Sequence, residues 1–300
     1  MSAGATFRQL LASEELLVCP DAHDPLTARI VDMADFDAIH MTGFGTSLAR
    51  SGYADVGLTT LTEVLDNARK FATQVDVPVF CDADDGYGDV RNVIRTVEEF
   101  VHTGVAGIHL EDQATPKRGI ISGHEVVSED RFLSKVEAAC DVRDEHDEDF
   151  VVVARSDAPG AENATLDDAI ARLNGAVDLG ADAAFVIGQS TEEEVIRVGE
   201  EIDAPLVYDW NGYHPRLNPE TLTEYGYDVA IVSMLATRAT MIGVYRRAKQ
   251  LEEGLDVTFE MMDEIEDLDR SWVEFAGFSK VLEWEEAYGQ IDVTDVEMDG

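Results

Sequence analysis

Short apolar runs recur along the chain, and most of them lead into a polar or acidic residue followed by a segment with helical spacing. The clearest pair lies within residues 77–124. Residues 77–80 lead into Asp82 and Asp84, and residues 107–110 lead into Glu111. A helix-like segment, 89–103, connects the two runs. This pattern predicts two neighbouring parallel strands whose carboxyl ends carry acids at one edge of a sheet.

The alternation of side chains along a strand assigns these polar residues to faces. Asp82 and Asp84 share one face of their strand, and His109 and Glu111 share one face of the next, from which Asp112 points away. A single acid at a strand end is equally consistent with a cap on the following helix. The four residues together favour a site for a hard cation such as Mg²⁺.

The same alternation of apolar run and helical segment continues through most of the chain. The predicted strands are 16–21, 38–43, 77–80, 107–110, 150–157, 183–188, 206–210 and 229–234. Runs that are apolar on both faces are typical of parallel strands covered by helices. Eight such units predict a closed (β/α)8 barrel within a single domain, 1–300. The alternative is an open doubly wound sheet, which the absence of GxGxxG after the first run disfavours.

The last predicted helices, about 258–290, lie beyond a complete barrel. They carry the aromatic residues Trp272, Phe275, Phe278, Trp284 and Tyr288. Such a layer needs a surface to cover, and either a neighbouring subunit or the protein's own barrel satisfies that need.

The charge balance changes the picture of the surface. The 300 residues include 62 acids against 22 bases, for a net charge of -40, and 45% of the residues are hydrophobic. The chain is therefore a globular protein with a dispersed acidic surface, which repels nucleic acids and anionic membranes. An excess of this size indicates an organism with molar internal salt, where screening weakens the self-repulsion. The alternative is an ordinary acidic protein.

Cysteine usage and the lack of a long apolar run bear on location. The three cysteines, Cys19, Cys81 and Cys140, form no CxxC pattern, so a zinc site or a disulfide framework is not expected. No run reaches the length of a membrane span, and the N-terminus lacks a signal core. We therefore expect a reduced, cytoplasmic protein.

Other polar residues are predicted at the same end of the barrel, where the active sites of such barrels lie. Arg155 offers a planar fork for a carboxylate or phosphate. A Gly-rich loop, 43–47, follows the second strand, and Asn211 follows the seventh. Asp157 is expected to cap the segment after its strand. Acids, an arginine and a Gly-rich loop around one opening suit an anionic substrate bound to a metal.

The chain resembles the isocitrate lyase and phosphoenolpyruvate mutase superfamily. The resemblance spans about residues 7–290 and rests on DADDGYG at 82–88, GIHLEDQ at 107–113, PKR at 116–118 and ARSDA at 154–158. It implies a (β/α)8 barrel, Mg²⁺ or Mn²⁺, and an α-oxo or α-hydroxy carboxylic acid substrate. It also implies dimers or tetramers in which the last helices are swapped between subunits.

The resemblance also implies a role for each matching position. Asp82 and Asp84 match the metal-site acids, and Glu111 and Asp55 match residues that hold metal-bound water. Arg155 matches the arginine that binds the substrate carboxylate. The remaining matches are Thr42, Gly43, Gly45 and Thr46 for backbone contacts to that carboxylate, Asn211 for substrate binding, and Lys117, Ser122 and His124 in the catalytic loop.

Three positions depart from the family pattern. Lyases of this family carry a loop cysteine that protonates the enolate, whereas residues 117–124 read KRGIISGH and place Ser122 at that point. A hydroxyl is a much weaker acid than a thiol. Gly188 and Gln189 stand near the point where an acid is usual, and Asp85 stands where Thr is usual.

Three functions remain open from the sequence. The first is a Mg²⁺-dependent carbon–carbon lyase that acts on an isocitrate- or methylisocitrate-like 2-hydroxy acid through an enolate. The second is an oxaloacetate decarboxylase or hydrolase, or a phosphonopyruvate-type enzyme, which needs no loop cysteine. The third is a catalytically silent barrel that binds a metabolite.

Overall fold

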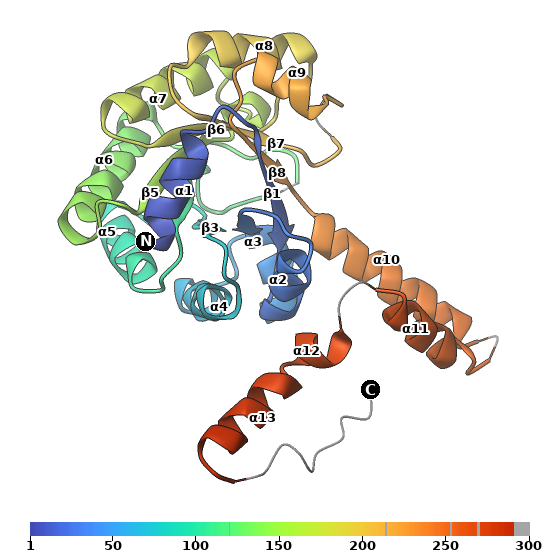
Figure 1. The fold of residues 1–300 in the computed structure, drawn as a ribbon. Helices are drawn as coiled ribbons and strands as arrows, with labels where there is room; N and C mark the ends of the chain where they lie inside the picture. The colour runs from blue at the N-terminus through green and yellow to red at the C-terminus, as the bar shows by residue number, and fades with distance from the viewer. Residues whose placement is uncertain (120, 214, 253, 269–270, 291–300) are drawn as a thin grey trace. The chain divides into compact units, whose positions relative to one another are not determined.

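The computed structural model describes residues 1–119, 121–213, 215–252, 254–268 and 271–290 (Figure 1). The chain divides into two compact units, 1–238 and 239–300. The first unit is a closed barrel of parallel strands in the order β1 to β8, as the sequence predicts. The strands are β1 (Leu17–Ala22), β2 (Ile39–Met41), β3 (Val79–Asp82), β4 (Gly107–Glu111), β5 (Val151–Ser156), β6 (Ala183–Val186), β7 (Leu206–Asp209) and β8 (Val229–Val232).

Helices follow the strands around the first unit (Figure 1). They are α2 (Pro25–Asp32), α3 (Gly43–Thr46), η1 (Ser47–Ser51), α4 (Leu61–Gln74), α5 (Val90–Val101), α6 (Glu129–His146), η2 (Ala158–Gly160), α7 (Leu166–Asp178), α8 (Glu192–Glu201) and α9 (Pro219–Glu224), with α1 (Ala3–Leu11) before β1. Several start at the capping residues that the sequence offers. Thr60, Thr165 and Thr191 each form a capping box with the residue three positions later.

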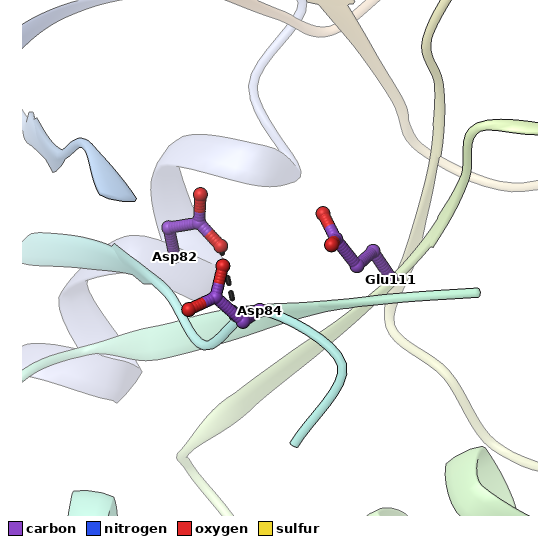
Figure 2. A group of neighbouring side chains, drawn as sticks. All are labelled: Asp82, Asp84 and Glu111. Carbon is purple, nitrogen blue, oxygen red and sulfur yellow. Dashed lines mark hydrogen bonds between the residues drawn. The ribbon is translucent and has the colours of Figure 1, made fainter. Parts of the chain in front are cut away.

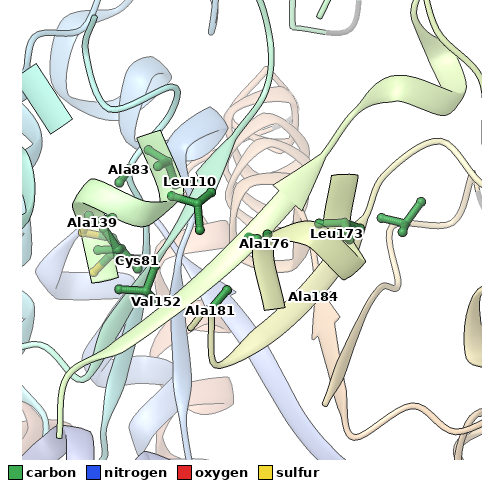
Figure 3. Packing of buried hydrophobic residues seen from close by; sticks show 14 of the residues in the cluster. Cys81, Ala83, Leu110, Ala139, Val152, Leu173, Ala176, Ala181 and Ala184 are labelled. Atoms are coloured by element: carbon green, nitrogen blue, oxygen red, sulfur yellow. The ribbon is translucent and has the colours of Figure 1, made fainter. Parts of the chain in front are cut away.

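Two apolar layers hold the strands, and consecutive residues belong to different layers. Phe80 lies inside the barrel, whereas the next residue, Cys81, packs outward with Leu110 and Val152 against the surrounding helices (Figure 3). Phe7 of α1 stacks on Phe80 with ring centroids 5.5 Å apart. The interior is therefore filled by side chains, and only the carboxyl ends of the strands are open for a site.

The register of the sheet aligns the polar strand ends. Asp82 on β3 is paired with His109 on β4, and Glu111 on β4 is paired with Arg155 on β5. Paired residues of neighbouring strands project to the same face, so these four side chains converge at the opening of the barrel.

The predicted Gly-rich loop at 43–47 was wrong. These residues form α3, which continues directly into the π-helical η1. Tertiary contacts hold this helical path: the Asn67 side chain of α4 donates to the Thr46 hydroxyl and to the His23 carbonyl. Such contacts override the low helix propensity of Gly43 and Gly45.

The second unit is helical. Its described helices are the greater part of α10 (Leu235–Gln250), which begins in the first unit, then α11 (Val257–Glu266), α12 (Trp272–Ala276) and α13 (Phe278–Ala287). The predicted C-terminal helices at about 258–290 are thus present, although residues 269–270 of that range, and residues 291–300 of the predicted single domain, lie outside the described part. Many large apolar side chains of this unit are exposed, among them Val244, Tyr245, Phe259, Phe278 and Trp284.

Candidate active site

A cavity of about 180 Å³ opens at the carboxyl ends of the strands. Strands β2 to β7 and the segments after the strands, including the one after β8, supply its walls. Its polar lining consists of His40, Thr42, Asp55, Asp82, His109, Gln113, Lys117, Arg155, Asp157, Asp209, Asn211 and Ser233, and its apolar lining includes Phe44, Phe185, Ile187 and Met234. A small cavity with this many charged groups suits a compact anionic ligand.

Three carboxylates form the centre of the site. One oxygen from each of Asp82, Asp84 and Glu111 lies within 4.8 Å of the others, and Figure 2 shows the three side chains around a common point. Asp82 is the last residue of β3. Asp84 lies beyond the strand with a left-handed backbone (φ 48°), and its N–H donates to Asp82 Oδ1 at 2.9 Å. The predicted convergence of these acids is therefore present in the structure.

Lys117 lies among these carboxylates, with its side chain 9% exposed. Its ammonium nitrogen contacts Asp84 Oδ1 and lies 3.2 Å from Asp55 Oδ2 and 3.5 Å from Glu111 Oε1. Burial alone would lower the pKa of Lys117, but the surrounding carboxylates raise it well above its usual value. Lys117 is therefore protonated at neutral pH and supplies a positive charge at this point.

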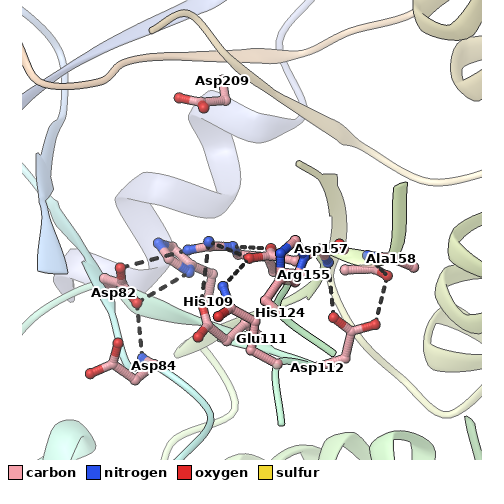
Figure 4. Close-up of polar contacts among 12 residues, drawn as sticks. Asp82, Asp84, His109, Glu111, Asp112, His124, Arg155, Asp157, Ala158 and Asp209 are labelled. Carbon is pink, nitrogen blue, oxygen red and sulfur yellow. Dashed lines mark hydrogen bonds and ion pairs between the residues drawn. The ribbon is translucent and has the colours of Figure 1, made fainter. Parts of the chain in front are cut away.

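Arg155 lies on the other side of Glu111. Its Nε and Nη2 atoms form a fork on Asp157, at 2.8 and 2.9 Å, and Nη2 also lies 3.1 Å from Glu111 Oε2 (Figure 4). Asp157 was expected to cap the following segment, and that was wrong: no cap bond from its side chain is present. Its carboxylate faces the cavity because Arg155 and the amide of Gln113 bind it.

Asp112 points away from the cavity, as the alternation predicts. It accepts hydrogen bonds from the Ser156 hydroxyl at 2.7 Å and from the Asp157 N–H at 2.8 Å, and it lies 3.3 Å from Arg172. These bonds tie the end of β4 to the end of β5. Asp112 therefore helps to hold Glu111 and Arg155 in position without facing the cavity itself.

Two histidines form the floor of the cavity. The Nε2 atoms of His40 and His109 are 3.0 Å apart, and the ring of His109 packs beside Phe80 and Phe185. Burial lowers the pKa of His40 to about 4 and that of His109 to about 3, so both rings are neutral at pH 7. They supply a polar floor that adds no charge.

The start of α3 forms another wall. Thr42 and Phe44 line the cavity, whereas Gly43, Gly45 and Thr46 are buried behind it. A Cβ atom on Gly43 would lie only 2.5 Å from Asp82 Oδ2. The lack of a side chain at Gly43 thus allows the chain to pass directly beside this carboxylate.

The other predicted site residues fall into two groups. Asn211 lines the cavity and donates a hydrogen bond to Asp209. Ser122 and His124 are not among the lining residues: Ser122 is exposed, and the His124 ring binds the Asp157 carbonyl oxygen at 3.0 Å. The described structure therefore does not bring these two together with the acids.

Sequence reasoning missed three lining residues, His40, Gln113 and Asp209, and placed Asp157 at this end of the barrel but expected it to cap a helix. Asp209 carries the same signal that identified Asp82, because each is an acid at the end of an apolar run. His40 and Gln113 give no such signal, because their orientation depends on the closure of the barrel.

The charges of the site fit a divalent cation. Six carboxylates (Asp55, Asp82, Asp84, Glu111, Asp157 and Asp209) stand against two cations (Lys117 and Arg155), so full ionisation leaves an excess of four negative charges. Both Glu111 oxygens are buried and, among the described residues, have ion-pair partners in Lys117 and Arg155 but no hydrogen bond of suitable geometry. Burial raises the pKa of Asp84 to about 6 and raises the pKa of Glu111 well above its usual range. A hard cation with oxygen ligands would relieve this excess.

Comparison with known proteins shows the family to which this fold and this site belong. The family model described as phosphoenolpyruvate phosphomutase matches residues 7–252. The chain is 34% identical over 296 residues to 2,3-dimethylmalate lyase of Eubacterium barkeri, covering 96% of this chain and 99% of that one. It is 37% identical over 237 residues to probable 2-methylisocitrate lyase 2 of Corynebacterium glutamicum, covering 78% and 76%.

Solved structures are similar to this chain along most of its length. Oxaloacetate acetylhydrolase in complex with 3,3-difluorooxalacetate matches with a TM-score of 0.87 and 30% identity over 97% of this chain and 98% of that one. Phosphonopyruvate hydrolase in complex with oxalate and Mg²⁺ matches with a TM-score of 0.84 and 27% identity over 96% and 99%. The chain belongs to the phosphoenolpyruvate mutase/isocitrate lyase superfamily, and it is an enzyme of that superfamily. Among the described residues, no helix is long and apolar enough to cross a membrane.

Proposed function

We propose that the protein is a Mg²⁺-dependent carbon–carbon lyase that cleaves an isocitrate- or methylisocitrate-like 2-hydroxy carboxylic acid through an enolate. The observation that carries this proposal is the position of the three carboxylates of Asp82, Asp84 and Glu111 beside the Arg155 fork at one small cavity. The names of the relatives, lyases of 2,3-dimethylmalate and 2-methylisocitrate, support this substrate class.

In this proposal Asp82, Asp84 and Glu111, together with Asp55, hold Mg²⁺ (or Mn²⁺) directly or through water. The bound metal would polarise the substrate oxygen and stabilise negative charge that develops during cleavage. Arg155 binds a substrate carboxylate, and Thr42 and Asn211, which line the cavity, form further substrate contacts. Gly43, Gly45 and Thr46 lie behind that wall, so their predicted backbone contacts to the substrate require that α3 shift on binding. The substrate hydroxyl loses its proton, its oxygen becomes a carbonyl, and the electrons of the broken C–C bond form an enolate that must be protonated.

The test is an assay of the purified protein in molar KCl with Mg²⁺. Isocitrate, 2-methylisocitrate and 2,3-dimethylmalate are supplied separately, and glyoxylate or pyruvate is measured. Release of one of these products, its loss with EDTA and its return with Mg²⁺ are the expected results. No turnover of any of the three would rule out this proposal.

A second candidate is an enzyme that acts on oxaloacetate or on a phosphonopyruvate-type α-oxo acid. The observation in its favour is the position of the cysteines, all of which are described: Cys19, Cys81 and Cys140 are buried in the apolar layers and none lines the cavity. Burial raises the pKa of Cys140 to about 12, so this thiol is a poor acid. Loss of oxaloacetate without cleavage of the three hydroxy acids would favour this second function.

Ser122 gives a direct test of the loop. If Ser122 occupies the place of the lyase cysteine when residues 117–124 close over the substrate, with Lys117 and His124 beside it, Ser122→Cys supplies a better acid for the enolate. Carbon–carbon cleavage should then become faster. An unchanged rate would show that the enolate takes its proton from elsewhere.

We infer that the protein is a homo-oligomer, a dimer or tetramer, whose contact includes the C-terminal helices. Support comes from the exposure of large apolar side chains there: Phe259 is 70% exposed and Trp284 is 54% exposed. Light scattering after gel filtration measures the mass. A monomer, or an oligomer unchanged when Phe259 and Trp284 are both replaced by Glu, would contradict this inference.

We further propose a cytoplasmic enzyme of a halophile. The net charge of -40 supports adaptation to molar salt, and three free cysteines support a reducing compartment. If the protein is adapted to molar salt, we expect its activity to require molar KCl.

A further inference from the structure

The ammonium group of Lys117 lies where a cation would bind. Its nitrogen contacts Asp84 Oδ1 and approaches Asp55 Oδ2 and Glu111 Oε1 at 3.2 and 3.5 Å. Two of these acids, Asp84 and Glu111, belong to the three-carboxylate cluster drawn in Figure 2. The carboxylates that could hold a metal therefore already hold a positive charge supplied by the chain.

The Lys117 ammonium group and a divalent metal ion cannot share these oxygens. The ligand oxygens of the cluster lie within 4.8 Å of one another, which leaves room for one cation at its centre. A Mg²⁺ ion requires oxygens at about 2.0–2.1 Å, closer than an ammonium group approaches them. The ammonium group and the metal ion, both within one buried cluster, would also repel each other strongly.

Open space beside the Lys117 side chain allows its ammonium group to move away from the carboxylates. Lys117 lines a second cavity of about 560 Å³, together with Leu58, Tyr87 and Pro116, on the side of Asp84 and Glu111. It also lines the first cavity, near Arg155. Open space therefore exists on both sides of the side chain.

The backbone around Lys117 is tied at the base of its segment. Gln113 and Val126 form an antiparallel bridge, and the Asn163 side chain binds both the N–H and the carbonyl of Val126. Thr115 donates to Asp85, and His124 contacts the Asp157 carbonyl and accepts from the Glu162 N–H, so both ends of the loop are held without Lys117. Between them, the Lys117 ammonium supplies the ion pairs that join residues 116–119 to the candidate metal acids. Release of this side chain therefore loosens residues 116–119 while both ends stay in place.

We propose that Lys117 is an internal counter-ion that competes with the divalent metal, so that metal binding displaces Lys117 and releases residues 116–119. This inference rests on the proposed metal site. Before the metal arrives, Lys117 offsets part of the repulsion among the buried acids. After displacement its ammonium is available to the substrate cavity. One side chain thus couples occupancy of the metal site to the mobility of the loop.

The test compares Mg²⁺ affinity of three full-length proteins by titration calorimetry in molar KCl: wild type, Lys117→Met and Lys70→Met. Lys70 pairs with Asp66 at the surface, so its replacement removes the same charge away from the site. Because the competing state lowers the apparent affinity by the fraction of competent protein, Lys117→Met should bind Mg²⁺ about tenfold or more tightly than wild type. Lys70→Met should stay within about twofold of wild type.

Equal or weaker binding by Lys117→Met overturns the competition and leaves the metal site standing. Absence of Mg²⁺ binding in both the wild type and Lys117→Met overturns the metal site itself and the competition with it. Hydrogen exchange of the wild type is a second measurement that needs no variant. Exchange in 116–119 should increase when Mg²⁺ is added without substrate, and unchanged or slower exchange there would contradict the release of these residues.

Discussion

Arg155 is the residue on which substrate recognition depends in the proposed mechanism. Its fork is held by Asp157 and Glu111, and it lies 3.7 Å from Asp82. This arrangement fixes the plane of the guanidinium and leaves it at the wall of the cavity. Asp157 and Glu111 occupy Nε and Nη2, so Nη1 is the nitrogen left for a substrate carboxylate. Lysine would keep the charge, but its single ammonium cannot hold these carboxylates and the substrate in one plane.

We therefore expect Arg155→Lys to lower kcat/KM by about 100-fold, which corresponds to the loss of a charge-assisted pair of hydrogen bonds. Steady-state kinetics with the substrate found in the assay measure the change. The matched control is Arg172→Lys, because Arg172 is also buried and pairs with Asp112 outside the cavity. An equal loss in both variants would mean that the effect is structural.

Asp21 predicts a pH dependence of stability. Its carboxylate is fully buried and accepts hydrogen bonds from the N–H groups of Met234 and Ala236, at 2.7 and 2.9 Å. Burial raises its pKa from 3.8 to about 6, although these bonds act in the opposite direction. The folded state thus holds the proton more tightly than the unfolded state. The stabilisation is present below about pH 4 and is lost as the pH rises through 6.

Asp21→Asn removes this titration, so the free energy of unfolding should fall less steeply between pH 4 and pH 7 than it does in the wild type. The difference in slope integrates to at most about 3 kcal/mol. Urea unfolding at constant molar salt measures it. Asp141→Asn, at an exposed position on α6, removes the same charge and should keep the wild-type slope. Parallel pH profiles for wild type and Asp21→Asn would contradict the assignment.

Among the elements, α3 bears most directly on the metal acids. Gly43 is its first residue, and a Cβ atom there would lie 2.5 Å from Asp82 Oδ2 and 2.8 Å from Cγ. Gly43→Ala must therefore move either α3 or the Asp82 side chain. We expect Mg²⁺ affinity to fall by about tenfold, since a displaced carboxylate no longer matches the strict geometry of Mg²⁺.

Calorimetric titration of Gly43→Ala with Mg²⁺ measures this loss. Gly243→Ala is the matched control, because a Cβ atom at Gly243 of α10 meets no other atom within 4 Å. The control should bind Mg²⁺ as the wild type does. Wild-type affinity in Gly43→Ala would show that α3 gives way instead of Asp82.

The elements also show what the sequence could and could not reveal. Alternation along β3 and β4 was enough to place Asp82 and Glu111 together, because it depends only on the strand period. The helical path of 43–47 was not predictable from its glycines, because Asn67 of α4 supplies the contacts that fix it. Asp157 faces the cavity instead of capping the next segment, because its carboxylate is bound by Arg155, two residues earlier, and by Gln113 from the segment after β4.

At the scale of the whole molecule, the acidic surface opposes folding by self-repulsion. A net charge of -40 on 300 residues gives each added proton or screening ion a favourable effect on the compact state. Salt should affect the site itself much less than this surface, because the charges of the site are buried and salt screens buried charges less than exposed ones.

We expect the melting temperature at pH 7.5 to rise by about 10 °C between 0.1 and 1 M KCl, as the Debye length falls from about 10 to about 3 Å. Circular dichroism at increasing temperature measures it. At pH 4.5 many exposed carboxylates are protonated, so the repulsion is smaller and the same change in salt should raise the melting temperature by clearly less. An equal rise at both pH values would attribute the salt effect to stronger burial of apolar surface, which does not depend on carboxylate charge.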